Sequence, residues 1–389
     1  MQAWVHIDPQ QVLADARARD AEKPRSPLHG IPVAIKDIID TADMPTEYGS
    51  PIYAGHRPRV DAACVAMLRN AGAVIMGKTV TAEFAMSYPG KTRNPINTEH
   101  TPGGSSSGSA AAVADHMVPL ALGTQTGGSV LRPAAFCGIV GFKPTFDAIN
   151  PVGVKPNSKS YDTVGLLGRS VADVALAFAV MTRQDASGFA LPAIEKPRIG
   201  FYRTLQWSKA EAATVAALEG AASRLAKAGA HIREITMPEK FNELFDARNR
   251  IGEFESSRAL AWERRHFEEK ISAGVREKLR KADSVTLDQY FAAQKVLAEC
   301  RRLLEITFGD FDVLLVPSAP GEAPKGLTTT GDAVFNQTWT ALHTPAVTVP
   351  VFRGPAGLPM GATFVGPYGA DYKALACAEW ARRALGANA

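Results

Sequence analysis

The chain has 389 residues, of which 46% are hydrophobic and 21% are charged, and its formal net charge is +4. This composition is ordinary for a globular protein, and the small charge without a Lys/Arg block argues against nucleic-acid binding. No Cys-x-x-Cys spacing occurs among the four cysteines, so neither a zinc site nor a redox pair is predicted. With a charged amino-terminal segment and no apolar run of about 18 residues, we expect a cytoplasmic protein without a membrane span.

The first 182 residues predict alternating helices and strands. Helices are expected over 9–22, 60–71 and 110–114 and from residue 133, and strands over 30–39, 73–76, 118–122 and 139–142. Residues 143–168 are rich in Pro, Gly, Asn and Ser and are expected to form a loop, after which Ser170 caps a helix over 171–182. Such alternation is typical of βαβ units around a parallel or mixed sheet.

The second half predicts a helical layer inside the same domain. No proline occurs between Pro238 and Pro317, and the helix-forming region, approximately 206–310, lies between expected strands at 198–202 and 313–316. A polar loop, two strands at 346–351 and 361–365, and a helix over 371–385 follow. We therefore expect one α/β/α domain over 1–389, with a central mixed, twisted sheet covered by helices on both faces.

Two turns rich in glycine and serine carry the most specific chemical signal. Ser105 lies within Thr101–Ser109, and Ser129 ends the segment Gly123–Ser129. Glycines allow sharp turns and bring backbone N–H groups close to a ligand. A pocket of hydroxyls and N–H donors suits nucleophilic attack on a carbonyl with an oxyanion hole.

Two other segments fit known sequence motifs, but the residues around them do not fit the structures that those motifs require. Gly72–Thr79 fits a phosphate-loop pattern, but its interior residues are apolar and strand-like, so phosphate binding is disfavoured. Gly104–Gly108 fits a nucleophile elbow with Ser106 as nucleophile, yet no apolar strand precedes it. A hydrolase that uses Ser106 and a histidine stays open as an alternative, although these histidines have no revealing neighbours: His116, His231, His266 and His343.

Lys36 is the unusual basic residue, because it lies in the apolar run Gly30–Ile39. Such a lysine either extends its amine to solvent or is desolvated. Burial would lower its pKa from about 10.4 and leave neutral amine to accept a proton. Serine activation without histidine requires such a base.

Together these segments resemble the amidase signature family. The match is carried by Gly103–Val113, Leu120–Ser129, Pro133–Thr145, Gly30–Asp37 and the ending Thr344–Pro350, and it is weakest over 200–310. The signature core covers approximately 30–170. The resemblance implies an amidase fold and an amidohydrolase of linear amides that needs no cofactor or metal.

The resemblance also implies the residue roles. Ser129 would be the nucleophile that forms an acyl-enzyme, Ser105 the bridging serine in a cis peptide bond, and Lys36 the base. The oxyanion hole would be formed by the backbone N–H groups of Thr126, Gly127, Gly128 and Ser129. Substrate contacts would come from Arg132, Gly104, Ser106 and Thr124.

Three positions depart from the family's pattern. Gln125 stands where the family often has Asp, Ser107 where it often has Gly, and Arg132 follows Ser129 by three positions rather than two. The shifted arginine resembles the malonamidase group, in which it grips a substrate carboxylate. If residues 129–132 form a helical turn, Arg132 and Ser129 share a face; the alternative is a structural ion pair at the helix start.

We therefore expect hydrolysis of a small, carboxylate-bearing amide, malonamate-like, by an enzyme without nucleic-acid or membrane partners. The alternatives are the glutaminase subunit of a tRNA-dependent amidotransferase, an amidase of neutral or aryl amides, and an inactive binding member of the fold. A homodimer is expected from relatives. Candidates to close the pocket are Phe335, Asn336, Trp339 and Thr328–Thr330.

Overall fold

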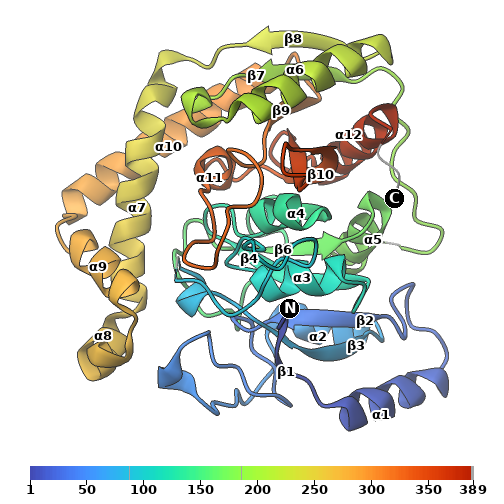
Figure 1. Ribbon diagram of the computed structural model, residues 1–389, viewed down its shortest axis with the longest axis vertical. Helices are drawn as coiled ribbons and strands as arrows, with labels where there is room; N and C mark the ends of the chain where they lie inside the picture. Colours follow the sequence, from blue (N-terminus) through green and yellow to red (C-terminus); the bar gives the residue numbers. More distant parts are fainter. Residues whose placement is uncertain (87, 185, 387–389) are drawn as a thin grey trace.

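One sheet of eleven strands organises the computed structural model, which describes residues 1–86, 88–184 and 186–386 (Figure 1). The strands are β1 (Trp4–His6), β2 (Pro32–Lys36), β3 (Val74–Thr79), β4 (Leu120–Gln125), β5 (Val140–Lys143), β6 (Thr163–Gly168), β7 (Arg198–Tyr202), β8 (His231–Ile235), β9 (Val313–Pro317), β10 (Ala346–Arg353) and β11 (Pro359–Val365). Their order across the sheet is β1-β3-β2-β4-β6-β5-β10-β11-β9-β7-β8. β2 runs parallel to β3 and β4, whereas β6 is antiparallel to β4 and β5. The predicted mixed sheet is confirmed.

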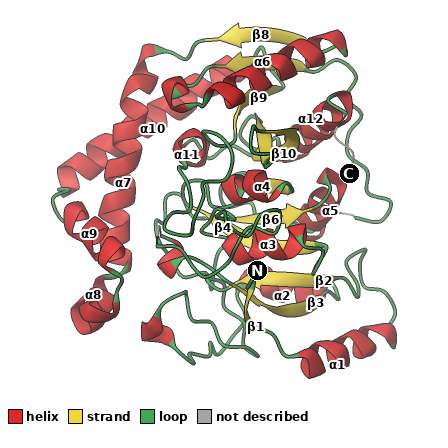
Figure 2. Ribbon diagram, viewed as in Figure 1, coloured by secondary structure: helices red, strands yellow, loops and turns green. Residues whose placement is uncertain are grey.

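Helices cover both faces of this sheet (Figure 2). They are α1 (Pro9–Asp20), α2 (Ala63–Asn70), α3 (Ser107–Ala114), α4 (Leu131–Cys137), α5 (Val171–Met181), α6 (Ala212–Lys227), α7 (Leu244–Ala259), α8 (Ala261–Phe267), α9 (Ala273–Ala282), α10 (Leu287–Phe308), α11 (Val334–Ala341) and α12 (Asp371–Ala384). Alternation along β2 separates the two faces. Val33 and Ile35 join one apolar cluster with α2, α5 and α12, while Ala34 packs with the alanines of α3 in another. This α/β/α layering is the fold class expected from the sequence.

The small residues of α3 let this helix approach the sheet closely. A Cβ added to Gly108 would lie 2.3 Å from the Ala3 carbonyl oxygen and 2.4 Å from the Val80 nitrogen. Only glycine fits at this distance. The close approach fixes the amino-terminal end of α3, and with it the serine turn that precedes the helix.

Helices α7 to α10 run along one side of the molecule (Figure 1). α7 packs against α10 and α9, and both α7 and α10 contribute to an apolar cluster with the sheet strands β9 and β11. α10 begins with a capping box, in which Thr286 and Gln289 exchange side-chain and backbone hydrogen bonds. None of the described helices combines the length and apolar character needed to cross a bilayer.

The structure corrects four local predictions. The expected loop over 143–168 ends in β6, a fully buried strand whose Gly-containing run resembles a loop in the sequence. β1 has only three residues, and β8 is an edge strand with no buried residue, so neither has a clear apolar pattern. The polar segment before the last strands contains α11, whose buried face tertiary packing stabilises.

Candidate active site

The predicted base lies at the carboxyl end of β2. Lys36 Nζ is 2.7 Å from Ser105 Oγ and 2.7 Å from Thr124 Oγ1, and it donates to the Thr124 carbonyl at 3.4 Å. β2 and β4 are parallel, which brings Lys36 beside Thr124. The lysine is fully buried and has no ion pair among the described residues. Burial lowers the pKa of Lys36 well below its usual value, and the charge of Asp162 opposes that change.

Ser105 lies between β3 and α3, directly after a cis Gly104–Ser105 peptide bond. Its carbonyl accepts a hydrogen bond from the Ala82 N–H at 3.1 Å. The next N–H, of Ser106, donates to the Ser129 carbonyl at 3.3 Å. The serine turn therefore contacts both the lysine and the second turn.

Ser129 lies in the turn between β4 and α4. Among the described residues the N–H groups of Gly127, Gly128 and Ser129 have no backbone or side-chain acceptor, which leaves them available to a ligand. The Ser129 hydroxyl likewise makes no hydrogen bond to a described residue, so the direct contact with Ser105 that a proton relay requires is not formed here. Gly128 packs tightly: an added Cβ would lie 2.9 Å from Asn336 Nδ2.

Gln125 supports this turn from behind. Its Oε1 accepts hydrogen bonds from the Val130 and Leu131 N–H groups at 2.9 and 3.1 Å, and its Nε2 donates to Thr340 at 3.0 Å. These contacts satisfy donors at the start of α4 that have no partner within the helix. The Gln125 amide thus stabilises the start of α4, at a position where the amidase signature family often has Asp.

Arg132 lies in the first turn of α4 and is buried. Its Nη2 donates to the Gly104 carbonyl at 2.6 Å and to Thr330 Oγ1 at 3.1 Å, while its Nε has no partner among the described residues. No described carboxylate lies within ion-pair distance, so the alternative of a structural ion pair is wrong. The helix begins at Leu131, after Ser129, although the Arg132 N–H bonds the Gly128 carbonyl. Burial lowers the pKa of Arg132 to about 10.

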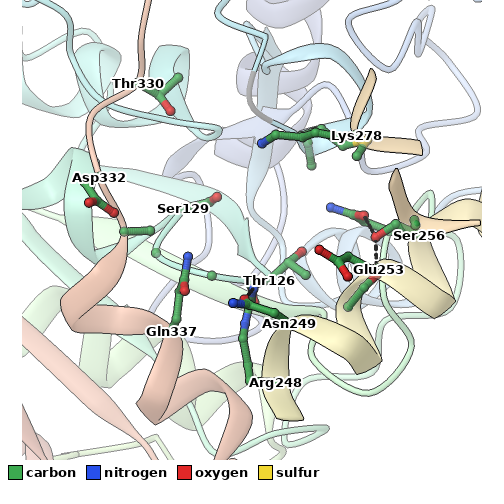
Figure 3. Close-up of a pocket in the computed structure, with 18 of the residues that line it drawn as sticks. Thr126, Ser129, Arg248, Asn249, Glu253, Ser256, Lys278, Thr330, Asp332 and Gln337 are labelled. Carbon is green, nitrogen blue, oxygen red and sulfur yellow. Dashed lines mark hydrogen bonds between the residues drawn. The ribbon is translucent and has the colours of Figure 1, made fainter. Parts of the chain in front are cut away.

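A cavity of about 460 Å³ opens in front of Ser129. Thr126–Ser129 and Arg132 line one side, and α7 and α9 line the other. Figure 3 shows Lys278 of α9 extending into this space and Glu253 of α7 across from Asp332. Arg248 of α7 also lines the cavity.

Of the four predicted substrate contacts only Arg132 lines the cavity, whereas Gly104, Ser106 and Thr124 do not. Ser106 Oγ is fully buried and bonds only the Thr124 backbone, donating to the carbonyl and accepting from the N–H. Thr124 itself serves Lys36, and neither residue lines the cavity. Of the residues expected to close the pocket, Thr330 lines it, whereas Phe335 and Trp339 are core residues.

The residues of the phosphate-loop and nucleophile-elbow patterns stabilise the fold. Lys78 of the phosphate-loop pattern is buried in β3, where it donates to the Ile39 carbonyl at 2.7 Å and pairs with Asp37 at 3.4 Å. No described histidine bonds Ser106 or Ser129: His343 lies 2.8 Å from the Ser160 carbonyl, and the other three candidates are exposed. Within the described residues, no cluster of three or more His, Cys, Asp or Glu is arranged to hold a metal ion.

Residues of the site that the sequence did not reveal come from the loop before β6 and from α7. Asp162 is half-buried and accepts a hydrogen bond from the Thr126 hydroxyl at 2.5 Å. Arg248 Nη2 donates to the Thr126 carbonyl at 3.1 Å, and its guanidinium lies over the Tyr161 ring. No spacing pattern links these residues to the serine turns, so only the three-dimensional structure brings them together.

Comparison with known proteins shows the family. A family model described as "Amidase" matches residues 1–375. The chain belongs to the amidase family. The chemistry expected from the sequence, hydrolysis of C–N bonds, is that of the family. Among solved structures, a crystal structure of an amidase superposes with a TM-score of 0.89 at 28% identity, covering 98% of this chain and 92% of that chain. The peptide amidase from Stenotrophomonas maltophilia superposes with a TM-score of 0.81 at 29% identity, covering 100% and 90%.

Curated relatives carry a more specific name. The A-type subunit of glutamyl-tRNA(Gln) amidotransferase from Symbiobacterium thermophilum is 40% identical over 60% of this chain and 52% of that protein. The chain therefore spans about half the length of this relative. The corresponding protein of Anaeromyxobacter sp. (strain K) is 34% identical over 91% of this chain and 82% of that protein.

Proposed function

We propose that this amidase-family protein hydrolyses a carboxamide through an acyl-enzyme on Ser129, with Ser105 as the bridging hydroxyl and Lys36 as the base. The observation that carries the proposal is the 2.7 Å distance between the Lys36 amine and Ser105 Oγ, in a site where the lysine is fully buried without a counter-ion among the described residues. A buried, unpaired amine favours its neutral form, which has a lone pair for a proton.

The hydrogen bonds of Lys36 fit a neutral amine. Such an amine has two N–H donors and one lone pair. The two oxygens of Thr124 accept these donors. With a neutral amine, the Ser105 hydroxyl, whose oxygen lies 2.7 Å from Nζ, would donate to the lone pair. Thr124 would thus orient the base, which explains why Thr124 does not line the substrate cavity.

In the proposed reaction Ser129 Oγ attacks the amide carbon, and its proton passes to Ser105 while the Ser105 proton passes to Lys36. The unbonded N–H groups of the 127–129 turn stabilise the negative oxygen of the tetrahedral intermediate. The proton then returns through Ser105 to the leaving nitrogen, the C–N bond breaks, and water releases the acid from Ser129. The contact between Ser129 and Ser105 would tighten with substrate in place, as catalytic hydrogen bonds often do.

The charges of the cavity favour a substrate with a carboxylate. Arg132 and Arg248 both line it, and neither forms an ion pair with a described carboxylate. A guanidinium is a planar donor that matches a carboxylate. The charges of Asp332 and Glu253 act on Arg132 and Arg248 without an ion-pair contact. A small amide that carries one carboxylate would form the direct contact with a guanidinium that these side chains do not form.

Among such amides, the comparisons favour glutamine over malonamate. The curated relatives described above are named as the A-type subunit of glutamyl-tRNA(Gln) amidotransferase, not as malonamidases. A glutaminase subunit of a tRNA-dependent amidotransferase is therefore the second candidate function. It would deliver ammonia to a partner chain instead of releasing it.

A fluorophosphonate probe tests the nucleophile. We expect stoichiometric labelling of the wild-type chain, no labelling of Ser129→Ala, and labelling of Ser106→Ala, whose hydroxyl contacts only backbone. Labelling lost in Ser106→Ala and kept in Ser129→Ala would overturn the assignment. A wild-type chain that never reacts would indicate an inactive binding member of the fold.

Ammonia release from amides then separates the candidate substrates. L-glutamine, malonamate and neutral amides are compared with the isolated chain, and Ser129→Ala gives the blank. Turnover of malonamate by the isolated chain supports a stand-alone acid-amide amidase. Turnover of glutamine alone, rising when a partner chain is added, supports the glutaminase. Preference for neutral or aryl amides would contradict the carboxylate proposal.

A further inference from the structure

We propose that Asp162 is a positioning residue that couples the oxyanion turn to the base, and that helices α7 and α10 hold it in place. The inference rests on the proposed function of Ser129 and Lys36. Asp162 does not line the cavity, so it would act through its neighbours and not on the substrate.

Both carboxylate oxygens of Asp162 accept hydrogen bonds. Oδ1 accepts the hydroxyl of Thr126 at 2.5 Å, and Oδ2 accepts the N–H groups of Asn157 and Ser158 at 2.7 and 2.9 Å. Thr126 is the first residue of the turn that carries the free N–H donors. Its side chain is held by Asp162 and its carbonyl by Arg248, so the entry to the turn is fixed from two sides.

Asp162 is also the charged group that acts on the base. Lys36 forms no ion pair with a described residue, and among described side chains the charge opposing the burial effect on the pKa of its amine is that of Asp162. The charge of Glu255, from α7, acts in turn on Asp162. Burial raises the pKa of Asp162 to about 6, and its hydrogen bonds oppose that rise. The carboxylate is therefore ionised above about pH 6, where it makes protonation of Lys36 easier.

The helical layer fixes the loop that carries Asp162. Glu255 accepts hydrogen bonds from the hydroxyls of Ser158 and Ser160, at 2.5 and 2.6 Å, and from the Ser160 N–H at 3.0 Å. The hydroxyl of Tyr290 of α10 donates to the same carboxylate at 2.7 Å. Glu255 of α7 thus holds both helices against the loop. Asp162 of the same loop in turn bonds Thr126 at the start of the oxyanion turn.

Asp162→Asn tests the proposal, because it keeps the shape and removes the charge. The second-order rate of fluorophosphonate labelling is measured from pH 5 to 10. We expect the plateau rate to fall about tenfold or more, as for a misplaced catalytic group. We also expect the acid limb to move about one pH unit lower, because the Lys36 pKa falls without the neighbouring charge. A purely structural role would lower the rate without moving this limb.

Thr126→Val removes the other partner of the same hydrogen bond. Thermal denaturation shows whether Asp162→Asn is folded, and if it is not, Thr126→Val replaces it as the test variant. If the two residues act as a pair, the double variant is no slower than the slower single variant. The matched control is Asp115→Asn, an exposed carboxylate without a side-chain contact to a described residue, which should leave rate and pH profile unchanged. Additive losses, or an unmoved acid limb with a normal plateau, would overturn the proposal. If wild type does not label at Ser129, the proposed function fails first; if it labels and Asp162→Asn behaves as wild type, only this inference fails.

Discussion

Replacing Lys36 by methionine should lower activity strongly and change how stability depends on pH. Methionine matches the length of the lysine stem but has no amine. Loss of a general base typically costs 10²- to 10⁴-fold in rate, so we expect fluorophosphonate labelling of Lys36→Met to fall by about that factor. The stability effect follows from the burial of the amine, whose pKa lies well below 10.5 in the folded chain.

The sign of the stability effect follows from proton binding. Between the lowered folded pKa and 10.5, the unfolded chain holds a proton on Lys36 that the folded chain does not. The free energy of unfolding of wild type therefore rises with pH through this window, by about 1.4 kcal/mol per pH unit for this group. Lys36→Met lacks this contribution. Lys78 and Lys143, whose pKa values burial lowers to about 8 and about 7, act alike in both proteins and cancel in the comparison.

Urea denaturation at pH 8.0, 8.75 and 9.5 measures the effect. The difference in unfolding free energy between wild type and Lys36→Met should rise by about 1.4 kcal/mol per pH unit in favour of wild type. Lys227→Met, at an exposed position of α6, is the matched control and should follow wild type in slope. If Lys36→Met also follows the wild-type slope, Lys36 keeps its proton on folding, and the neutral-base argument is refuted.

Two further substitutions test the surroundings of Ser129. Arg132→Ala should raise KM for carboxylate-bearing amides about tenfold or more, from the loss of a charge-assisted contact, with a much smaller change for neutral amides. Equal effects on both substrate classes would mean that Arg132 only holds the Gly104 carbonyl. Gln125→Ala should lower the free energy of unfolding by about 1–3 kcal/mol, because it leaves the Val130 and Leu131 N–H groups buried without an acceptor. Thermal or urea denaturation that shows no loss would contradict this role.

The sequence predicted the parts of the site that lie on the signature turns. Lys36, Ser105 and the Ser129 turn are recognisable because glycine and serine recur there at positions where core residues would otherwise stand, and because a lysine interrupts an apolar strand. The mixed sheet followed from the alternation of strands and helices. The structure brings Lys36 and Ser105 within hydrogen-bond distance, as expected.

The contacts that depend on tertiary packing could not be predicted. Thr124 and Ser106 both carry a hydroxyl and lie in the signature segments, yet Thr124 bonds Lys36 and Ser106 bonds only backbone. Asp162 lies in a segment that the sequence presents as a loop, and its partner Thr126 is 36 residues away in the chain. β6, which follows Asp162, is buried on both faces and has no alternating pattern to reveal it.

The two halves of the chain form opposite walls of the cavity, so we expect the second half to determine which substrate binds. Lys36 and both serine turns come from β2, β4 and the loops around α3, where resemblance to the family is strong. The opposite wall of the cavity comes from α7 and α9, in the region where that resemblance is weakest. α7 also holds the Asp162 loop through Glu255 and bonds the Thr126 carbonyl through Arg248. On the proposed function, a change in α7 would therefore alter both the wall that meets the substrate and the turn proposed to stabilise the oxyanion. We therefore expect α7 to link substrate choice and catalytic rate. Substitutions on its cavity face at Asn249 and Glu253 should change KM, whereas those at Glu255 should change kcat.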